Sequence, residues 1–269
     1  MRLVTQFTNL ALAGLTVVIA AMFLLWLVSL ARKDSSVVDP FWGPGFVGLT
    51  WLYFVLDAAP TGRQWLISTL VTVWGLRLGV YLLWRNWGEG EDFRYADMRR
   101  GWGRSFWWIS LFQVFLLQGV LMWLIAAPIL VIQAVDTPPL WRWTDVAGTL
   151  LWIVGLTFET VGDLQLARFK GDARNKGKVL DHGLWRYTRH PNYFGEAVLW
   201  WGYFLVALSV EGGLWTLVSP LLMTVLLLKV SGVSLLERSL RERRPEYRAY
   251  IERTSAFFPW PPAGDAKPR

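Results

Sequence analysis

Residues 182–196 hold the densest group of side chains in the chain that could do chemistry. The stretch reads His-Gly-Leu-Trp-Arg-Tyr-Thr-Arg-His-Pro-Asn-Tyr-Phe-Gly-Glu. Pro191 suits the first turn of a helix, where its missing N–H costs no hydrogen bond, so we expect a helix to begin there. Such a start offers free N–H groups and the positive end of the helix dipole. Because Arg189 and His190 stand directly before it, the stretch predicts an anion site suited to phosphate or carboxylate. The first turn adds Asn192, Tyr193 and Glu196.

A second group of ionisable side chains falls inside or at the margins of long apolar segments. A charged group in a membrane is energetically expensive, so each is a candidate functional residue. The alternative is that they pair with one another or extend to the interface for stability alone. The group comprises Asp39, Arg77, Glu159, Asp163, Glu196 and Lys229.

Two carboxylates in this group are four residues apart, so Glu159 and Asp163 share one helix face. Paired carboxylates can serve acid–base chemistry, and they can equally accept hydrogen bonds from ribose hydroxyls or an amide. Their position just before a basic loop favours binding. Within that loop, Asn175-Lys176-Gly177-Lys178 is either a second phosphate contact or a solvated basic turn.

The elements that must position these groups are membrane helices. The chain of 269 residues is 54% hydrophobic and only 17% charged, against about 25% charged in soluble domains. Residues 3–31 and 105–135 contain no charge, and a helix needs about 20 apolar residues to cross a bilayer. The 19 tryptophans suit membrane interfaces. We therefore expect an all-α, polytopic membrane protein.

Seven spans are predicted: 8–31, 41–59, 64–85, 106–133, 143–166, 192–210 and 213–235. Basic residues concentrate in the loops 86–105 and 167–191 and in the tail after residue 235. Because basic loops face the cytoplasm, we expect the N-terminus outside and the C-terminus inside. The spans form one domain, 1–262, followed by a disordered tail, 263–269.

Composition also bears on partners. There is no cysteine, so no disulfide or thiolate metal site exists, and with two histidines we expect no metal centre. The net charge of +7 follows from topology and anionic lipid, so we expect no nucleic acid partner. Residues 43–48 match the pattern GxGxxG, but they lie in an apolar segment, include a proline and lack an acid about 20 residues on, so we reject a Rossmann motif.

Residues 183–196 resemble the signature of DUF1295, a family of bacterial membrane proteins of unknown function that is similar to the steroid 5α-reductases. The stretches 74–78, 84–86 and 90–95 match it too, and the resemblance extends over 36–259. It implies a seven-span reductase that holds NADPH in a cavity closed on the cytoplasmic side. Reductases of this type transfer hydride to the β carbon of an enone, while a tyrosine and a carboxylate or amide polarise the ketone oxygen.

The resemblance also implies a set of cofactor residues. Asp163, Asn192 and Glu196 match the cofactor positions, and Glu159 stands where these reductases tend to have asparagine. The full predicted set is Arg77, Arg94, Tyr95, Glu159, Asp163, Lys170, Asn175, Lys176, Lys178, Tyr187, Arg189, His190, Asn192, Tyr193, Glu196 and Glu237. The many cations favour the 2′-phosphate of NADPH over NADH.

For catalysis, Asp39 falls at the carboxylate position. The expected tyrosine position, three residues before Arg77, is Trp74, whose N–H is a weaker acid than a phenol. Tyr53 and Tyr81 are nearby substitutes.

Three functions compete. The first is an NADPH-dependent reductase of an α,β-unsaturated ketone, acting as a monomer among membrane lipids on a steroid-like or other isoprenoid lipid. The second is an S-adenosylmethionine-dependent methyltransferase, because residues 189–195, Glu237 and residues 247–250 also resemble the isoprenylcysteine and phospholipid methyltransferases. The third is a non-catalytic lipid-binding protein. Asp39, Arg94-Tyr95 and residues 175–177 favour the reductase.

Overall fold

The computed structural model describes residues 2–56, 60–135, 140–230, 237 and 246–263. These residues form helices joined by loops, without a strand among them, so the all-α prediction is confirmed for this part of the chain. The chain divides into two compact units. The first contains residues 1–142 and 207–218, and the second contains residues 143–206 and 219–269.

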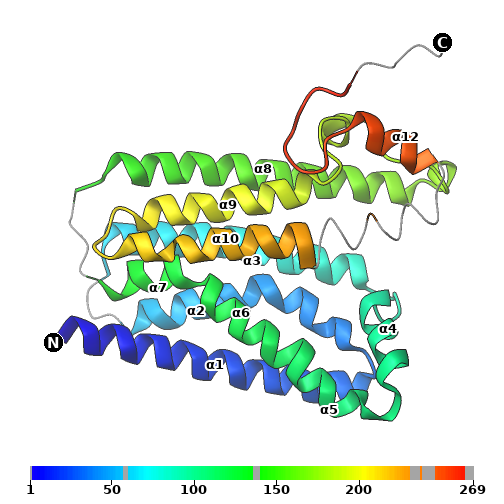
Figure 1. Cartoon of the computed structure of the whole chain (residues 1–269). Coiled ribbons are helices and arrows are strands. Elements are labelled where there is room, and N and C mark those ends of the chain that lie inside the picture. Colours follow the sequence, from blue (N-terminus) through cyan, green and yellow to red (C-terminus); the bar gives the residue numbers. More distant parts are fainter. Residues whose placement is uncertain (1, 57–59, 136–139, 231–236, 238–245, 264–269) are drawn as a thin grey trace. The chain divides into compact units, whose positions relative to one another are not determined.

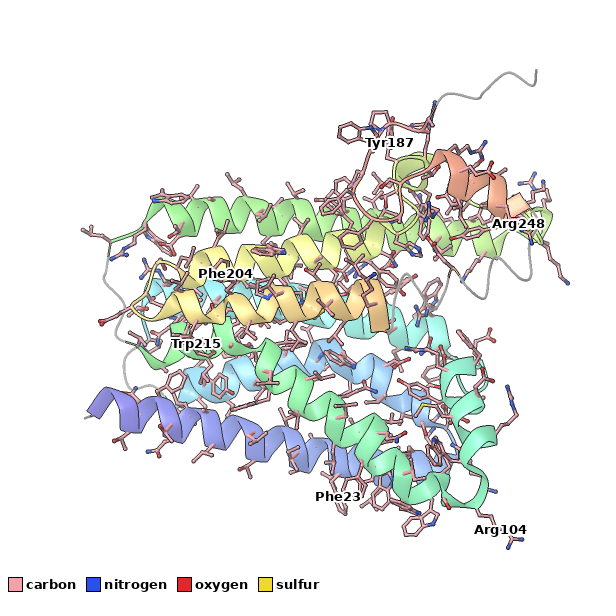
Figure 2. All side chains as sticks on the ribbon, in the orientation of Figure 1. Phe23, Arg104, Tyr187, Phe204, Trp215 and Arg248 are labelled. Carbon is pink, nitrogen blue, oxygen red and sulfur yellow. The ribbon has the colours of Figure 1, made fainter. Side chains whose placement is uncertain are left out.

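The first unit holds the N-terminal helices and a short helix from residues 207–218. They are α1 (Arg2–Arg32), η1 (Ser35–Phe41), α2 (Trp42–Val55), α3 (Gly62–Asn86), α4 (Phe93–Trp102), η2 (Gly103–Ser105), α5 (Phe106–Ser110), the π-helical η3 (Leu111–Leu116), α6 (Leu117–Ile125), α7 (Ala127–Ala134) and η6 (Gly213–Leu217). Helices α1 and α6 lie side by side (Figure 1). The apolar side chain of Phe23 projects outward from α1 (Figure 2), with 44% of its surface exposed, as expected where lipid replaces water.

Helices α2 and α3 are held together by close backbone contact. A Cβ on Gly75 would lie 2.6 Å from the Gly43 carbonyl oxygen, and a Cβ on Gly43 would overlap the Gly75 carbonyl oxygen. Small residues at such positions let helices approach closely in membranes, where packing replaces the hydrophobic effect. Gly43 opens the GxGxxG-like stretch, so here it serves helix packing.

The second unit is built on α8 (Trp143–Gly171) and α9 (Pro191–Ala207), which lie side by side (Figure 1). Glycines spaced by seven residues line both helices: Gly148, Gly155 and Gly162 on α8, and Gly195 and Gly202 on α9. A Cβ on Gly155 would lie 2.6 Å from the Gly195 carbonyl oxygen, and one on Gly202 would lie 2.7 Å from the Gly148 carbonyl oxygen.

The remaining elements are η4 (Ala173–Asn175), η5 (Gly183–Arg186), α10 (Val218–Val225), whose first residue belongs to the first unit, the π-helical η7 (Leu226–Val230) and α12 (Glu246–Arg253).

Each predicted span lies mostly in helix where the structure describes it. The main difference is in the fourth, 106–133, which is interrupted at Ala126, just before Pro128 at the start of α7. The second ends at Val55 and the sixth at Ala207, each a few residues early, while residues 57–59, 231–235 and the tail 264–269 lie outside the described residues. Ala263, predicted to be disordered, donates its N–H to the Arg253 carbonyl at 2.9 Å.

Within the described part of the chain, four helical segments are long and apolar enough to cross a membrane. They are Thr5–Arg32, Gly62–Asn86, Phe93–Ile125 and Trp143–Gly171.

Candidate functional site

The first unit contains a buried carboxylate with two strong partners. Asp39 lies in η1 with 8% of its surface exposed. The Tyr95 hydroxyl donates to its Oδ1 at 2.7 Å, and Nη2 of Arg94 donates to its Oδ2 at 2.6 Å. Tyr95 is itself buried, and the Arg94 guanidinium lies 5.1 Å from its ring centroid. The three side chains thus form a compact group that holds one carboxylate, one phenol and one fixed positive charge.

Local hydrogen bonds join η1 to the start of α4 and so bring this group together. Asp92 caps α4 by accepting from the Arg94 N–H at 2.9 Å, and its own N–H donates to the Ser36 hydroxyl at 2.7 Å. The Ser35 N–H donates to Glu91 at 2.8 Å. Two residues of η1 therefore bind the two residues that precede α4.

A polar chain continues from Tyr95 to α6 and α2. Nε2 of Gln118 donates to the Tyr95 hydroxyl oxygen at 3.4 Å. Nε1 of Trp42 donates to the Gln118 Oε1 at 2.6 Å. Asp39, Tyr95, Gln118 and Trp42 are therefore linked by consecutive hydrogen bonds.

Burial and charge act against each other on Asp39. Burial raises its pKa, while Arg94 and the hydrogen bond from Tyr95 lower it, and burial dominates, so the pKa of Asp39 lies above its usual value. For Asp92, burial also acts to raise the pKa, but the hydrogen bonds from Arg94 outweigh it and the pKa is lowered. Of the two carboxyls that bind Arg94, Asp39 therefore takes up a proton more readily than Asp92.

The tyrosine beside Asp39 is not one that the sequence nominated for catalysis. Trp74 is fully buried, with its ring 5.6 Å from that of Phe46. Tyr53 is fully buried against α1, and its hydroxyl has no hydrogen-bond partner among the described residues. Tyr81 lies beneath the Arg77 guanidinium at 5.5 Å. Tyr95, predicted to bind cofactor, holds the position next to the carboxylate.

In the second unit, acceptors gather where α8 meets the start of α9. Glu159 and Asp163 are buried on α8. Nδ2 of Asn192 donates to Asp163 Oδ1 at 3.1 Å, while the Asn192 Oδ1 is buried and has no partner among the described residues. Gly195 allows this approach, because a Cβ there would overlap the Glu159 backbone nitrogen. The face of α8 that carries Glu159 and Asp163 therefore packs against the start of α9 at Pro191.

Arg189 is buried and is used inside the unit. Its Nε donates to Glu237 Oε1 at 2.7 Å, and its Nη1 donates to the carbonyls of Ile251, at 3.1 Å, and Thr254. Nε2 of His190 lies 3.3 Å from the same Glu237 oxygen. Arg189 and His190, predicted to bind an anion, thus hold an internal carboxylate.

The electrostatics of this cluster are those of a buried ion pair. Burial acts to raise the pKa of Glu237, but hydrogen bonds from His190 and Arg189 outweigh it and lower the pKa to about 2. Burial lowers the pKa of His190, which favours its neutral form. The His190 ring stacks on Tyr193 with centroids 5.5 Å apart.

The stretch 183–190 also holds the C-terminal segment 246–263. The Thr188 hydroxyl donates to the Phe257 carbonyl at 2.9 Å, and the Trp260 N–H donates to the Tyr187 carbonyl at 2.9 Å. The Tyr187 side chain is exposed (Figure 2). Much of the motif therefore has a structural role that the sequence did not reveal, since its partners lie some 65 residues away in the chain.

The remaining predicted cofactor residues lie at the surface or on α9. Lys170, Lys176 and Lys178 are exposed, and Glu196 is half-buried. Asn175 donates to the Phe169 carbonyl at 3.1 Å and so caps the end of α8. No group of three metal-ligating side chains occurs in the described ranges.

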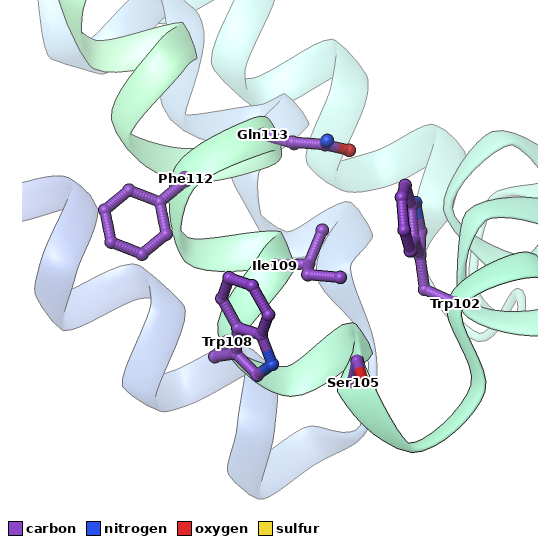
Figure 3. A pocket seen from close by; sticks show the side chains of 6 residues that line it. All are labelled: Trp102, Ser105, Trp108, Ile109, Phe112 and Gln113. Carbon is purple, nitrogen blue, oxygen red and sulfur yellow. The ribbon is translucent and has the colours of Figure 1, made fainter.

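A surface groove is lined by residues between Trp102 and Gln113, which follow Tyr95 in the chain. It has a volume of about 340 Å³ and lies between Trp102 of α4 and the side chains of α5 and η3 (Figure 3). It is lined by Trp102, Ser105, Trp108, Ile109, Phe112 and Gln113.

These features define an α-helical protein with membrane-type apolar helices and a buried acid–phenol pair. Residues 25–254 match the family described as "Protein of unknown function (DUF1295)", and the chain belongs to that family.

Known relatives are consistent with this family. An uncharacterised protein of Schizosaccharomyces pombe is 27% identical over 94% of this chain and 80% of its own length. Shorter stretches match 3-oxo-5-alpha-steroid 4-dehydrogenase 1 of Bos taurus, 33% identical over 25% of this chain and 26% of the relative, and steroid 5-alpha-reductase DET2 of Arabidopsis thaliana, 35% identical over 26% and 27%. No solved structure matches the chain.

Proposed function

We propose that this chain is a membrane-embedded, NADPH-dependent reductase of an α,β-unsaturated ketone carried by an apolar lipid, steroid-like or otherwise isoprenoid. In this proposal seven segments cross a bacterial inner membrane, with the N-terminus outside and the C-terminus in the cytoplasm. The protein acts as a monomer and has no nucleic acid partner. The local similarity to two steroid reductases supports the reaction class.

The observation that carries the proposal is the buried contact between Asp39 and the Tyr95 hydroxyl at 2.7 Å. A phenol supplies a proton to a ketone oxygen as that oxygen takes up negative charge. When Asp39 is protonated, its carboxyl O–H can donate to the Tyr95 oxygen. The phenolic proton of Tyr95 then becomes available to the substrate. The resemblance of the sequence to the steroid 5α-reductases implies such a combination of a tyrosine and a carboxylate.

The residues around the pair account for the proton balance. The ketone oxygen gains the Tyr95 proton, and Tyr95 regains one from Asp39. Asp39 is then an anion next to Arg94 Nη2, 2.6 Å away, which stabilises the carboxylate until solvent returns the proton. The product is an enol that isomerises to the saturated ketone.

The acceptors of the second unit fit a nicotinamide dinucleotide. Among the described residues, no donor reaches the buried Oδ1 of Asn192, and a carboxamide or a ribose hydroxyl provides one. Asp163, 3.1 Å from the Asn192 amide nitrogen, adds a carboxylate acceptor. NADPH, when bound, supplies the hydride that adds to the β carbon. Exposed Lys176 and Lys178 supply positive charge for a 2′-phosphate.

Ligand identity is the decisive experiment. We expect the purified protein in detergent to be stabilised against heat by NADPH more than by NADH, because binding to the folded state raises the apparent melting temperature. Asn192→Ala should lower the NADPH-induced shift. Stabilisation by S-adenosylmethionine alone would refute the reductase and revive the methyltransferase alternative, which the similarity to steroid reductases does not support.

A matched control separates ligand loss from unfolding. Thr157 lies on α8 and is exposed, and its hydroxyl donates to the Ile153 carbonyl at 2.8 Å. Thr157→Ala should keep the full NADPH shift. An Asn192→Ala protein with an unchanged NADPH shift would remove Asn192 from the cofactor site.

A further inference from the structure

The hydrogen bond between Trp42 and Gln118 has only one possible direction. An indole N–H donates and accepts nothing, so the atom of Gln118 that faces it at 2.6 Å must be the amide oxygen. The amide NH₂ of Gln118 therefore faces the other way. It points at the Tyr95 hydroxyl oxygen, which is 3.4 Å away.

This direction determines what the Tyr95 proton can do. If the amide oxygen of Gln118 faced Tyr95, it would accept the phenolic proton and compete with any other acceptor. With the NH₂ group there, Gln118 can only donate, so the Tyr95 proton must go elsewhere, to Asp39 or to a ligand.

The length of the Gln118 to Tyr95 bond is also informative. At 3.4 Å it lies beyond the usual 2.7–3.2 Å range, so it contributes little while Tyr95 is neutral. A donor held near an oxygen that later becomes negative interacts more strongly at that point. Interactions that strengthen in the transition state raise kcat rather than substrate affinity.

Two local features of the fold hold the chain of donors in place. Trp42 directly follows η1, so one continuous segment carries both Asp39 and the indole three residues later. Gln118 is the second residue after the π-helical η3. One extra residue in a helix rotates everything after it by about 100°, and this rotation determines which face of α6 carries Gln118.

We propose that Trp42 and Gln118 are positioning residues that make Tyr95 a one-way proton donor to the substrate ketone, an inference that rests on the proposed reductase function. Trp42 orients the Gln118 amide, and the amide stabilises the charge that forms on the Tyr95 oxygen as its proton leaves.

The test uses single substitutions, each made in the whole chain of 269 residues. Trp42→Phe keeps the aromatic ring but removes the N–H, and Gln118→Leu removes the amide. Trp51→Phe is the matched control, because Trp51 is also half-buried on α2 and donates its N–H to the Thr72 hydroxyl at 3.0 Å.

Two readouts are measured for each protein. The first is the ¹⁹F resonance of 3-fluorotyrosine at position 95, assigned with Tyr95→Phe among the eight tyrosines. The second is the rate of NADPH-dependent reduction of progesterone, a 4-en-3-one probe. We expect Trp42→Phe and Gln118→Leu to shift the resonance, and Trp51→Phe to leave it in place.

We expect kcat to fall about 10-fold in Trp42→Phe and about 100-fold in Gln118→Leu, each with KM unchanged. Gln118→Glu should lose more activity than Gln118→Leu, since an ionised Glu would bind the phenolic proton. An unmoved resonance in Trp42→Phe would overturn the proposal, as would a shifted resonance with unchanged kcat.

The ¹⁹F measurement needs no substrate, so failures of the two proposals can be told apart. If the wild-type protein neither binds NADPH nor reduces progesterone, the proposed reductase function fails. The catalytic role of Trp42 and Gln118 fails with it. The resonance then decides only whether Trp42 orients Gln118.

Discussion

At the scale of single residues, the sequence nominated the carboxylate and missed its partner. Asp39 stood out as a charge at the margin of an apolar segment, and the structure shows it buried against Tyr95. Trp74, Tyr53 and Tyr81 were the nominated donors, and they remain untested as catalytic residues. Spacing along the chain could not distinguish them from Tyr95, because Asp39 and Tyr95 are 56 residues apart and meet only through the contact of η1 with α4.

The raised pKa of Asp39 predicts a falling pH profile. The proposed proton transfer needs protonated Asp39, and its protonated fraction falls as pH rises through its pKa, which burial places above the usual value. We therefore expect kcat/KM to decline toward alkaline pH.

Asn in place of Asp39 provides the control for this assignment. Asp39→Asn keeps an N–H donor toward Tyr95 at every pH, so its residual activity should be independent of pH in this range. Asp39→Ala should lose about 100-fold or more in kcat. A fully active Asp39→Ala protein would remove Asp39 from the mechanism.

The buried pair of Arg189 and Glu237 predicts a loss of stability in acid. The pKa of Glu237 in the folded protein is about 2, below its usual value of 4.5. Because the pKa of Glu237 is lower in the folded protein than in the unfolded chain, its ionised form stabilises the fold at pH values above the unfolded pKa. This stabilisation is lost as pH falls from about 4.5 toward 2.

Glu237→Gln should remove that acid sensitivity and destabilise the protein at neutral pH. Breaking a buried pair costs about 3–5 kcal/mol, because the remaining charge stays buried. Because Arg189 also donates to carbonyls of the segment 246–263, faster proteolysis of that segment is expected. The same pH dependence of the melting temperature in wild type and variant would contradict this role of Glu237.

At the scale of elements, glycine contacts set which helices approach each other. The stripe on α8 and α9 places Glu159 and Asp163 next to the first turn of α9, and the contact of Gly43 with Gly75 joins α2 to α3. The heptad spacing of the glycines is visible in the sequence, but which stripes face each other is not.

Two glycines of α2 provide a direct test of close packing. Gly43→Ala places a Cβ against the Gly75 backbone, which cannot move aside like a flexible side chain, so we expect destabilisation of about 2 kcal/mol or more. Gly48→Ala places its Cβ in open space, and should be neutral or stabilising by up to about 1 kcal/mol, because alanine favours helix. Equal melting temperatures for the two variants would show that the close contact is unimportant.

At the scale of the whole molecule, the proposed topology can be tested because the chain has no cysteine. Single cysteines can be introduced at Arg104, Lys178 and Leu140, all exposed. In intact cells we expect a membrane-impermeant maleimide to label position 140 and to spare positions 104 and 178, because basic loops remain in the cytoplasm. Labelling of position 178 in intact cells would place that loop outside the cell and contradict the predicted seven-span topology.

The sequence by itself determined the all-α class and the positions of the long apolar helices, because length, hydropathy and a proline at a helix start are local properties of the chain. The start of α9 at Pro191 and the shared face of Glu159 and Asp163 follow from the same local rules. Only the tertiary structure decided that Tyr95 bonds to Asp39 and that Arg189 binds Glu237. Those contacts depend on which helices pack together, and a buried charge takes whichever partner the packing brings to it.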